Sequence, residues 1–331
     1  MRVFGFDQAR SADNAGAIIE AEWQTPTPTG HDILVAVKAV SINPVDTKIR
    51  QAKADDGTFT VAGWDAVGTV IAVGDKASMF QKGDDVWYAG AISRPGSNAE
   101  FQLVDERIVA VKPKSFDNAA AAAMPLTILT AWEALHQRMN ISRESAENEG
   151  RKLLIINGAG GVGSVAIQLA KLVGLHVTAT ASRDESRDWC LGFGADTVVP
   201  HAELTALPDS AFDWIFCCHD TDPYFDEAAR LIKPFGMICM LVNAQRDHNI
   251  QALKQKSAGL VWEFMFAHSN VGTDAQLSQH KILTEAARLV DKGALKSTLT
   301  KTLSPMTADN IRMGHQLIET GGMIGKLVIS T

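Results

Sequence analysis

The chain has 331 residues, 46% of them hydrophobic, and its 31 basic and 38 acidic residues give a formal net charge of −7. This length predicts two domains with substantial cores, and the scattered, mildly acidic charge argues against nucleic acid or a membrane surface as the main partner. Four cysteines without CxxC spacing, no signal-like start and no run of 18 apolar residues exclude a disulfide framework, a zinc ribbon and a membrane span, and predict a cytoplasmic protein.

Residues 1–125 are predicted to be rich in short β-strands. Gly, Pro, Asp and Asn punctuate the apolar, β-branched runs. The predicted strands cover residues 33–42, 68–73, 85–88, 99–104 and 107–111. Short strands at this spacing indicate a compact barrel or sandwich. The alanine run at 119–123 is predicted to be helical.

In residues 126–267, strands and helices alternate. The strand runs are apolar on both faces, which is typical of strands buried inside a parallel sheet. The predicted strands are 152–157, 176–181, 214–217, 236–242 and 261–266, and the predicted helices are 162–173, 184–193 and 223–232. Asp222-Pro223 is a favourable start for the last of these helices. This alternation predicts a doubly wound α/β domain.

Residues 268–331 form a mainly helical tail. Amphipathic helices are predicted at 275–292 and 307–320, followed by a closing strand at 326–329. A tail of this kind can return to the first domain. The predicted division is therefore 1–125 with 268–331, and 126–267 between them.

The clearest chemical motif is a GxGxxG loop that directly follows the strand 152–157 and precedes a helix. Gly158 permits the tight turn, Gly160 lets the backbone approach a pyrophosphate, and Gly163 lets the helix pack on the strand. Gly161 and Val162 complete the loop at the N-terminus of the helix, where anions are favoured. Methyltransferases use a similar loop, but the surrounding strand–helix–strand unit favours a dinucleotide site.

The end of the next strand bears on which dinucleotide binds. An NAD site places an acidic residue there, about twenty residues after the glycines, to hold the ribose 2′-hydroxyl. This chain has Ser182 and Arg183, a hydroxyl and a guanidinium that suit a 2′-phosphate, so we predict NADPH. Two alternatives stay open: Ser182 and Glu185 can form a capping box without a ligand, and Asp184 leaves room for NAD.

These motifs resemble those of the medium-chain dehydrogenase/reductase superfamily, in its quinone oxidoreductase-like branch, often labelled zinc-type alcohol dehydrogenase-like. The resemblance covers essentially the whole chain. Its segments are 41–46 (SINPVD), 63–68 (GWDAVG), 83–86 (GDDV), 96–101 (GSNAEF), 129–132 (LTAW), the glycine loop and 325–328 (GKLV). It implies a GroES-like β-barrel domain formed by 1–125 and 268–331, a Rossmann domain at 126–267, and a cleft for nicotinamide and substrate.

The chain departs from zinc alcohol dehydrogenases at the metal site. Where those enzymes have a cysteine, a histidine and a second cysteine, this chain has Asn43, Trp64 and Leu126, none of which is a usual zinc ligand. The four-cysteine structural lobe is also absent. The run 217–219 (CCH) looks metal-like, but successive strand residues point to opposite faces, so core cysteines are the preferred interpretation. We therefore predict no metal.

Without a metal to lower the pKa of an alcohol, the predicted reaction is hydride transfer from NADPH to an enone or quinone. Asn43, Asp46 and Lys48 are the candidates for polarising or protonating this carbonyl-conjugated substrate. Each also has a structural interpretation: Asn43 can shape a turn, Asp46 can cap the following helix, and Lys48 can be a solvated side chain.

The resemblance also implies further cofactor contacts. Thr130 matches a threonine beside the nicotinamide ring, Asn243 follows a strand at the edge where the ring is approached, and Lys326 matches a cofactor-side lysine. The last sheet strand, 261–266, pairs across a two-fold axis in the family, so a homodimer is predicted.

Other functions remain open on the sequence. The chain could be an alcohol or aldehyde dehydrogenase with a non-standard metal site around Asp46 and Asp65. It could instead be a dinucleotide-binding protein with little turnover, acting as a redox sensor or as an RNA-binding or structural protein, although its acidic charge weakens the RNA-binding interpretation.

Overall fold

A computed structural model describes residues 1–272 and 275–331. The chain forms two compact units: unit 1 comprises Met1–Leu126 and Phe266–Thr331, and unit 2 comprises Thr127–Met265. The boundaries predicted from sequence, 1–125 with 268–331 and 126–267, differ from these by one and two residues. A β-rich unit formed from both chain ends and an inserted α/β unit agree with the predicted fold class.

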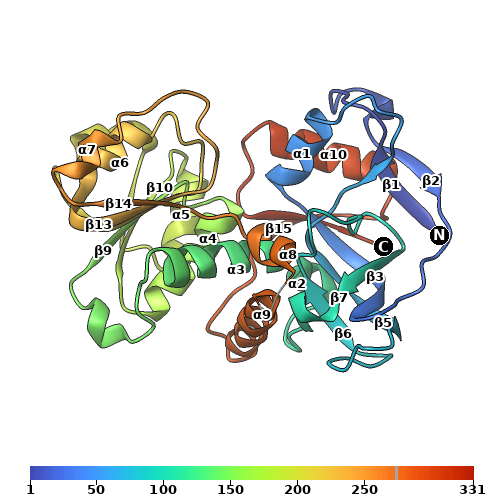
Figure 1. Ribbon diagram of the computed structural model, residues 1–331. Coiled ribbons are helices and arrows are strands. Elements are labelled where there is room, and N and C mark those ends of the chain that lie inside the picture. The colour runs from blue at the N-terminus through green and yellow to red at the C-terminus, as the bar shows by residue number, and fades with distance from the viewer. Residues whose placement is uncertain (273–274) are drawn as a thin grey trace. The chain divides into compact units, whose positions relative to one another are not determined.

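Unit 1 is organised around one long strand, β3. This strand pairs antiparallel with β5 on one side and with β7 and β16 on the other, where Leu327 of β16 lies opposite Ile42. The larger sheet contains β3 (Asp32–Ile42), β5 (Ala66–Val73), β6 (Asp85–Tyr88), β7 (Phe101–Asp105), β8 (Val109–Val111), β15 (Leu299–Leu303) and β16 (Lys326–Ser330). The smaller sheet contains β1 (Arg2–Phe6), β2 (Ile19–Glu22) and β4 (Thr60–Val61). The C-terminal tail thus returns to the first domain (Figure 1).

The helices of unit 1 come from both chain segments. They are α1 (Pro44–Gln51), α2 (Asn118–Ala122), α8 (Phe266–Val271), α9 (Gln276–Asp291) and α10 (Ala308–Glu319). α1 begins directly after β3, because Asn43 has extended backbone angles and Pro44 supplies a suitable first helical residue. α1 packs against α10, so the turn at Asn43 is supported by the C-terminal part of the chain.

Unit 2 is a doubly wound parallel sheet with the strand order β11-β10-β9-β12-β13-β14. Its strands are β9 (Lys152–Ile156), β10 (His176–Thr180), β11 (Thr197–Val199), β12 (Phe212–Cys217), β13 (Ile232–Met240) and β14 (Gly259–Trp262). Its helices are α4 (Gly161–Leu172), α5 (Asp184–Gly192), α6 (Phe225–Leu231) and α7 (Gln251–Lys254), and α3 (Pro125–Trp132) enters it from unit 1. The apolar residues 153–156 of β9 are fully buried, which explains their apolar run.

Several predicted boundaries were wrong. The predicted strand 261–266 is β14, which ends at Trp262, and Phe266 instead begins α8. An apolar run of this length does not by itself distinguish a strand from the start of a helix. α6 begins at Phe225, because the Asp222 carboxylate accepts hydrogen bonds from the loop residues Gln245 and His248 instead of capping that helix.

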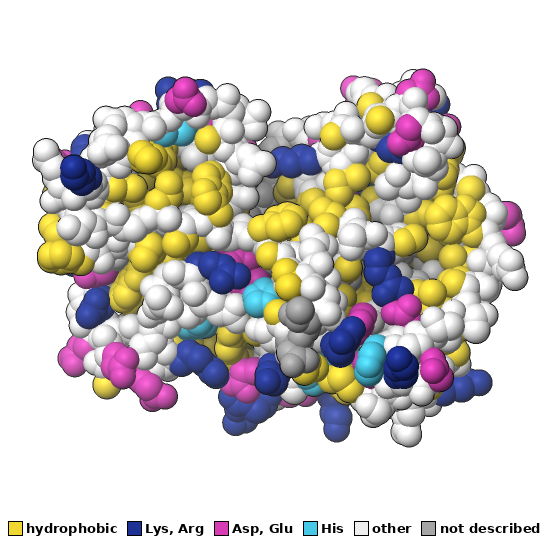
Figure 2. Space-filling view, viewed as in Figure 1, with side chains coloured by type: hydrophobic (Ala, Val, Ile, Leu, Met, Phe, Trp, Pro, Cys, Tyr) yellow, Lys and Arg dark blue, Asp and Glu magenta, His cyan; other side chains and the backbone are white. Residues whose placement is uncertain are grey.

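The edge of the unit 2 sheet is apolar and exposed. Within the part of the chain that the structure describes, β14 pairs with β13 alone; its last residue Trp262 and the nearby Phe264 are 44% and 52% exposed. Figure 2 shows hydrophobic side chains gathered over the region of β13 and β14. Among the described residues, no helix is both long and apolar enough to cross a membrane.

A buried polar network joins α1 to α10 in unit 1. The Arg50 guanidinium is fully buried, pairs with the Glu319 carboxylate, and donates from Nε to His315 Nδ1 at 3.2 Å. Burial and the neighbouring Arg50 lower the pKa of His315 to about 3. His315 must therefore be neutral in the folded protein, since its protonated ring would face a guanidinium.

This network predicts a loss of stability in acid. The unfolded chain protonates His315 near pH 6.5 and the folded protein only near pH 3. The free energy of unfolding should therefore fall as the pH drops through this range, by up to about 1.4 kcal/mol per pH unit from this group. Denaturant unfolding between pH 7 and pH 4 measures the slope. His315→Gln, which keeps an acceptor for Arg50, should flatten it, and an unchanged slope would contradict the assignment.

Candidate functional site

The glycine loop of unit 2 is held against the neighbouring strand. The backbone N–H of Gly158 donates to the Thr180 carbonyl at 3.0 Å, and that of Asn157 donates to Thr180 Oγ1 at 2.8 Å. Thr180 is the last residue of β10, which runs parallel to β9. The loop therefore lies at the carboxyl edge of the sheet, where open α/β sheets bind ligands.

The glycines are needed mainly for close packing. A Cβ on Gly163 would lie 2.3 Å from the Asn157 carbonyl oxygen, and one on Gly158 would lie 2.7 Å from the Ala179 Cβ. The left-handed residue of the turn is Asn157, with φ of 67°. Gly158 is thus required for contact with β10 rather than for the backbone freedom that the sequence analysis assigned to it.

The loop leads directly into α4, which starts at Gly161. Ser164 N–H makes the first hydrogen bond of the helix, to the Gly160 carbonyl at 2.9 Å. The preceding amides, from Gly161 to Gly163, have no carbonyl one turn earlier within the helix. These amides and the helix dipole suit an anion such as a pyrophosphate; the role predicted for Gly160, Gly161, Val162 and Gly163 stays a prediction.

Ser182 and Arg183 follow β10 and are both exposed. α5 begins after Arg183, and Ser186 Oγ accepts the Arg183 N–H at 3.1 Å. Ser182 is therefore not the N-cap residue, and the capping box with Glu185 considered from sequence does not form. Its hydroxyl oxygen instead accepts a weak hydrogen bond from the His201 backbone at 3.3 Å.

Sequence reasoning missed a cluster of rings beside Ser182. His201 Nδ1 lies 3.0 Å from the Tyr224 hydroxyl, and the His201 and His219 rings are 6.3 Å apart. Burial, and to a smaller extent His219, lower the pKa of His201. The sequence analysis did not predict the short strand β11. Because β11 places His201 at the same sheet edge, the position of His201 was not expected.

The other predicted cofactor residues lie in different places. Thr130 is buried in α3, and Asn243 is exposed beyond the end of β13. Both belong to unit 2, whereas Lys326 belongs to unit 1 and is buried there. Cys217 and Cys239 are buried free cysteines and Cys218 is half-buried, consistent with a structural role.

A buried polar cluster in unit 1 gathers Asn43, Asp46, Asp65 and Lys326. Lys326 Nζ donates to Asp65 Oδ2 at 3.1 Å, to the Ile42 carbonyl at 3.2 Å, and to Asn43 Oδ1. Asn43 Nδ2 donates to Asp65 Oδ2 at 2.8 Å. The other carboxylate oxygen of Asp65 accepts the Leu126 N–H at 2.7 Å, at the start of α3.

Asp46 joins this cluster through the backbone. Its carboxylate accepts the Asn43 N–H at 2.6 Å and the Gly63 N–H at 2.9 Å. Burial raises the pKa of Asp46 to about 7, although both hydrogen bonds and the Lys326 charge act in the opposite direction. Burial likewise raises the pKa of Asp65, opposed first by Lys326 and then by Asn43.

The cluster does not fit a zinc ion. Its side chains offer amide and carboxylate oxygens but none of the histidine or cysteine ligands that accompany carboxylates in protein zinc sites, and the Lys326 ammonium already lies against Asp65. Trp64 is buried and its indole N–H donates to the Ala91 carbonyl at 3.2 Å. Within residues 1–272 and 275–331, no group of three or more His, Cys, Asp or Glu side chains is placed to hold a metal.

The three candidate catalytic residues thus differ in environment. The side-chain polar atoms of Asn43 and Asp46 bind groups of unit 1, which agrees with the structural alternative for each. Lys48 lies on α1 and is exposed. The structure also adds Asp65, which the sequence analysis considered only as part of a non-standard metal site.

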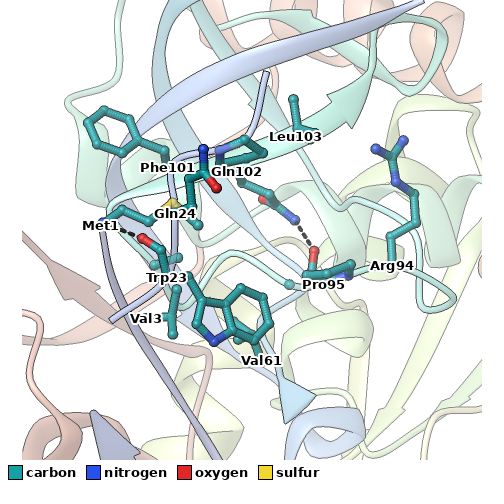
Figure 3. A pocket seen from close by; sticks show the side chains of 13 residues that line it. Met1, Val3, Trp23, Gln24, Val61, Arg94, Pro95, Phe101, Gln102 and Leu103 are labelled. Atoms are coloured by element: carbon teal, nitrogen blue, oxygen red, sulfur yellow. Dashed lines mark hydrogen bonds between the residues drawn. The ribbon is translucent and has the colours of Figure 1, made fainter. Parts of the chain in front are cut away.

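Unit 1 also contains a mainly apolar cavity of about 140 Å³. Trp23, Val61 and Phe101 contribute to its wall, and Gln102 Nε2 donates to the Pro95 carbonyl at 3.1 Å at its rim (Figure 3). None of the residues predicted to bind cofactor or substrate lines this cavity.

Comparison with known proteins covers the whole chain. Residues 29–114 match the alcohol dehydrogenase GroES-like domain, and residues 193–329 match a family described as zinc-binding dehydrogenase. A zinc-type alcohol dehydrogenase-like protein of Staphylococcus epidermidis is 42% identical, over 100% of this chain and 99% of its own.

Two further relatives bear on fold and chemistry. A solved Rhizobium etli structure, assigned provisionally as a zinc-dependent alcohol dehydrogenase, has a TM-score of 0.93 at 42% identity, over 100% of this chain and 98% of that one. The chloroplastic NADPH-dependent alkenal/one oxidoreductase of Arabidopsis thaliana is 36% identical over 68% of this chain and 59% of its own.

A GroES-like unit built from both chain ends, combined with a doubly wound sheet that carries a glycine-rich loop, defines the medium-chain dehydrogenase/reductase class. The chain belongs to this superfamily of oxidoreductases and, within it, to the zinc-type alcohol dehydrogenase-like proteins.

The packing of the glycine loop gives a direct test. Gly163→Ala places a methyl group 2.3 Å from the Asn157 carbonyl oxygen, so the loop must shift. We expect a loss of about 1–3 kcal/mol in stability and much weaker dinucleotide binding. Gly192→Ala is the matched control, because its Cβ would have no neighbour within 4 Å. Thermal unfolding and cofactor titration measure both effects, and equal behaviour of the two variants would refute the packing role.

Proposed function

We propose that this protein is an NADPH-dependent, zinc-independent reductase that transfers hydride to an enone or quinone-type small substrate. The observation that carries the proposal is the closed network of Asn43, Asp65 and Lys326. It includes Asn43, which the resemblance places at a zinc-ligand position, and it presents no histidine or cysteine ligand. The named activity of the Arabidopsis thaliana relative, an NADPH-dependent alkenal/one oxidoreductase, supports the same chemistry.

The reaction class follows from what this network can supply. Alcohol oxidation requires a group that lowers the pKa of the hydroxyl, which a metal ion provides in zinc enzymes. The three N–H bonds of the Lys326 ammonium already have three oxygen acceptors, so no donor is left for a substrate oxygen. Reduction of a conjugated carbonyl compound needs less assistance, because the carbonyl delocalises the developing charge.

Bound NADPH would supply the hydride. Gly158, Gly160, Gly161, Val162 and Gly163 would hold its pyrophosphate at the N-terminus of α4. Ser182 and Arg183, both exposed at the end of β10, would bind the 2′-phosphate through a hydroxyl and a guanidinium. Thr130 and Asn243 are proposed to contact the nicotinamide portion, as the resemblance implies.

The residues of unit 1 have separate proposed roles. Asn43 and Asp46 position the turn between β3 and α1, because their side chains bind the chain itself. Lys48 is exposed and is the proposed source of the substrate proton, directly or through water. Lys326, predicted to contact the cofactor, is instead assigned to the network around Asp65.

An alcohol or aldehyde dehydrogenase with a metal between Asp46 and Asp65 is the alternative function. The Lys326 ammonium argues against it, since a cation already lies against Asp65. A low-turnover NADPH sensor would use the same cofactor site. We further propose a cytoplasmic homodimer, because β14 is an exposed apolar edge that a second copy can cover.

Reductase activity is the first test. NADPH oxidation with a panel of enones and quinones should exceed alcohol oxidation with NADP⁺, and a chelator should leave it unchanged. Protein purified without added metal should contain far less than one zinc per chain by elemental analysis. Alcohol oxidation that disappears with the chelator would overturn the proposal, and tight NADPH binding without turnover would favour the sensor.

Cofactor choice is tested at Arg183. A charge-assisted hydrogen bond contributes about 1.5–3 kcal/mol, so Arg183→Ala should weaken NADPH binding by roughly 10- to 100-fold and leave NADH nearly unchanged. Arg187→Ala, also exposed on α5, is the matched control. Fluorescence titration of both cofactors gives the dissociation constants. If the wild type binds NADH more tightly than NADPH, or if Arg183→Ala weakens the binding of both cofactors equally, the assignment is incorrect.

The dimer is tested at β14. Light scattering of the 35.6 kDa chain should give about twice that mass at micromolar concentration. Trp262→Glu should shift the protein toward monomer, because it places a charge on the exposed edge, whereas Met313→Glu on α10 should not. A wild-type monomer, or the same mass for both variants, would rule out this interface.

A further inference from the structure

The Lys326 side chain is bound in the way proteins bind a small cation. Its ammonium lies against a backbone carbonyl from Ile42, an amide oxygen from Asn43 and a carboxylate oxygen from Asp65. The side chain is almost fully buried. Three donors therefore meet three acceptors, with no water needed to complete the set.

The charges around it require a cation. Asp46 and Asp65 are both fully buried; burial raises the pKa of each, the Asp65 charge further raises that of Asp46, and Lys326 lowers the pKa of both. Without Lys326, two carboxyl groups would remain in the interior, and no other ion pair among the described residues would hold either of them. A buried charge left without its partner is strongly destabilising.

The segments that meet at this ammonium are distant in sequence. The turn after β3 supplies Asn43, the connection before β5 supplies Asp65, and Asp65 in turn holds the start of α3 through Leu126. Lys326 begins β16, 283 residues after Asn43. Joining separate segments through one cation is what a structural metal ion does in a protein.

We propose that the Lys326 ammonium is a tethered cation that takes the place of a metal ion in this chain. It keeps the positive charge and the cross-link but offers no open position to a substrate. Removing it should leave a site for small cations with N–H donors, because all the surrounding acceptors are oxygens. This inference rests on the zinc independence of the proposed function, but its test uses no substrate.

The experiment is chemical rescue of Lys326→Ala. Truncation should lower the melting temperature by roughly 5–15 °C, since it leaves the buried Asp65 carboxylate without its cationic partner. Ethylammonium should then raise the melting temperature of this variant more than that of the wild type. Tetramethylammonium, which has the same charge and no N–H, should not. Lys301→Ala, an exposed lysine on the neighbouring β15, controls for loss of a surface charge.

A double variant covers the case in which Lys326→Ala fails to fold. Asp65→Asn combined with Lys326→Met removes both charges together. The double variant should lose less stability than the two single variants lose together, because each single variant leaves one buried charge without its partner. Additive losses, or equal effects of ethylammonium and tetramethylammonium on Lys326→Ala, would overturn the proposal.

The outcomes also separate this inference from the proposed function. Amine-specific rescue in a protein that reduces neither enones nor quinones would keep the tethered cation and reject the reductase. Reductase activity without amine-specific rescue would keep the reductase and reject the tethered cation.

Discussion

The ion pair between Lys326 and Asp65 is the contact on which the polar centre of unit 1 depends. Two carboxyl groups and an amide are buried there, and burial of charge is unfavourable unless every group is paired. The ammonium satisfies this requirement for Asp65 and Asn43 at once. It also binds the last strand of the chain to the turn that begins α1, so the position of that turn depends on residues almost three hundred positions away.

The chemistry of unit 2 has a different basis, because it uses the backbone. The glycine loop is formed by amides at the start of α4, and its shape is maintained by hydrogen bonds to Thr180 and by the absence of side chains at Gly158 and Gly163. Side chains enter only at the ends of the strands, where Ser182, His201 and Tyr224 gather. Backbone amides do not distinguish one dinucleotide from another, so under the proposed function selectivity would come from side chains at these strand ends.

The two units differed in how well they could be predicted. The central strands β9 and β12 of unit 2 are buried on both faces, so their apolar runs stand out, and the turn between β9 and α4 carries its motif within six residues. β11, β15 and the strands of the small sheet were missed, because they are short or carry polar residues on an exposed face. The end of β14 was misplaced, because the apolar residues resume after Glu263 and continue into the start of α8.

The sequence alone determined the glycine-rich loop, the alternation of strands and helices, and the presence of Asn43, Trp64 and Leu126 where the family resemblance leads one to expect zinc ligands. These features are local, since each depends on residues within one strand, turn or short motif. Only the tertiary structure decided that Lys326 lies against Asp65 and Asn43. It likewise decided that Ser182 does not cap α5 and that His201 lies beside Ser182. Contacts between buried charges far apart in the chain leave no pattern in the sequence, because they depend on which segments the fold brings together.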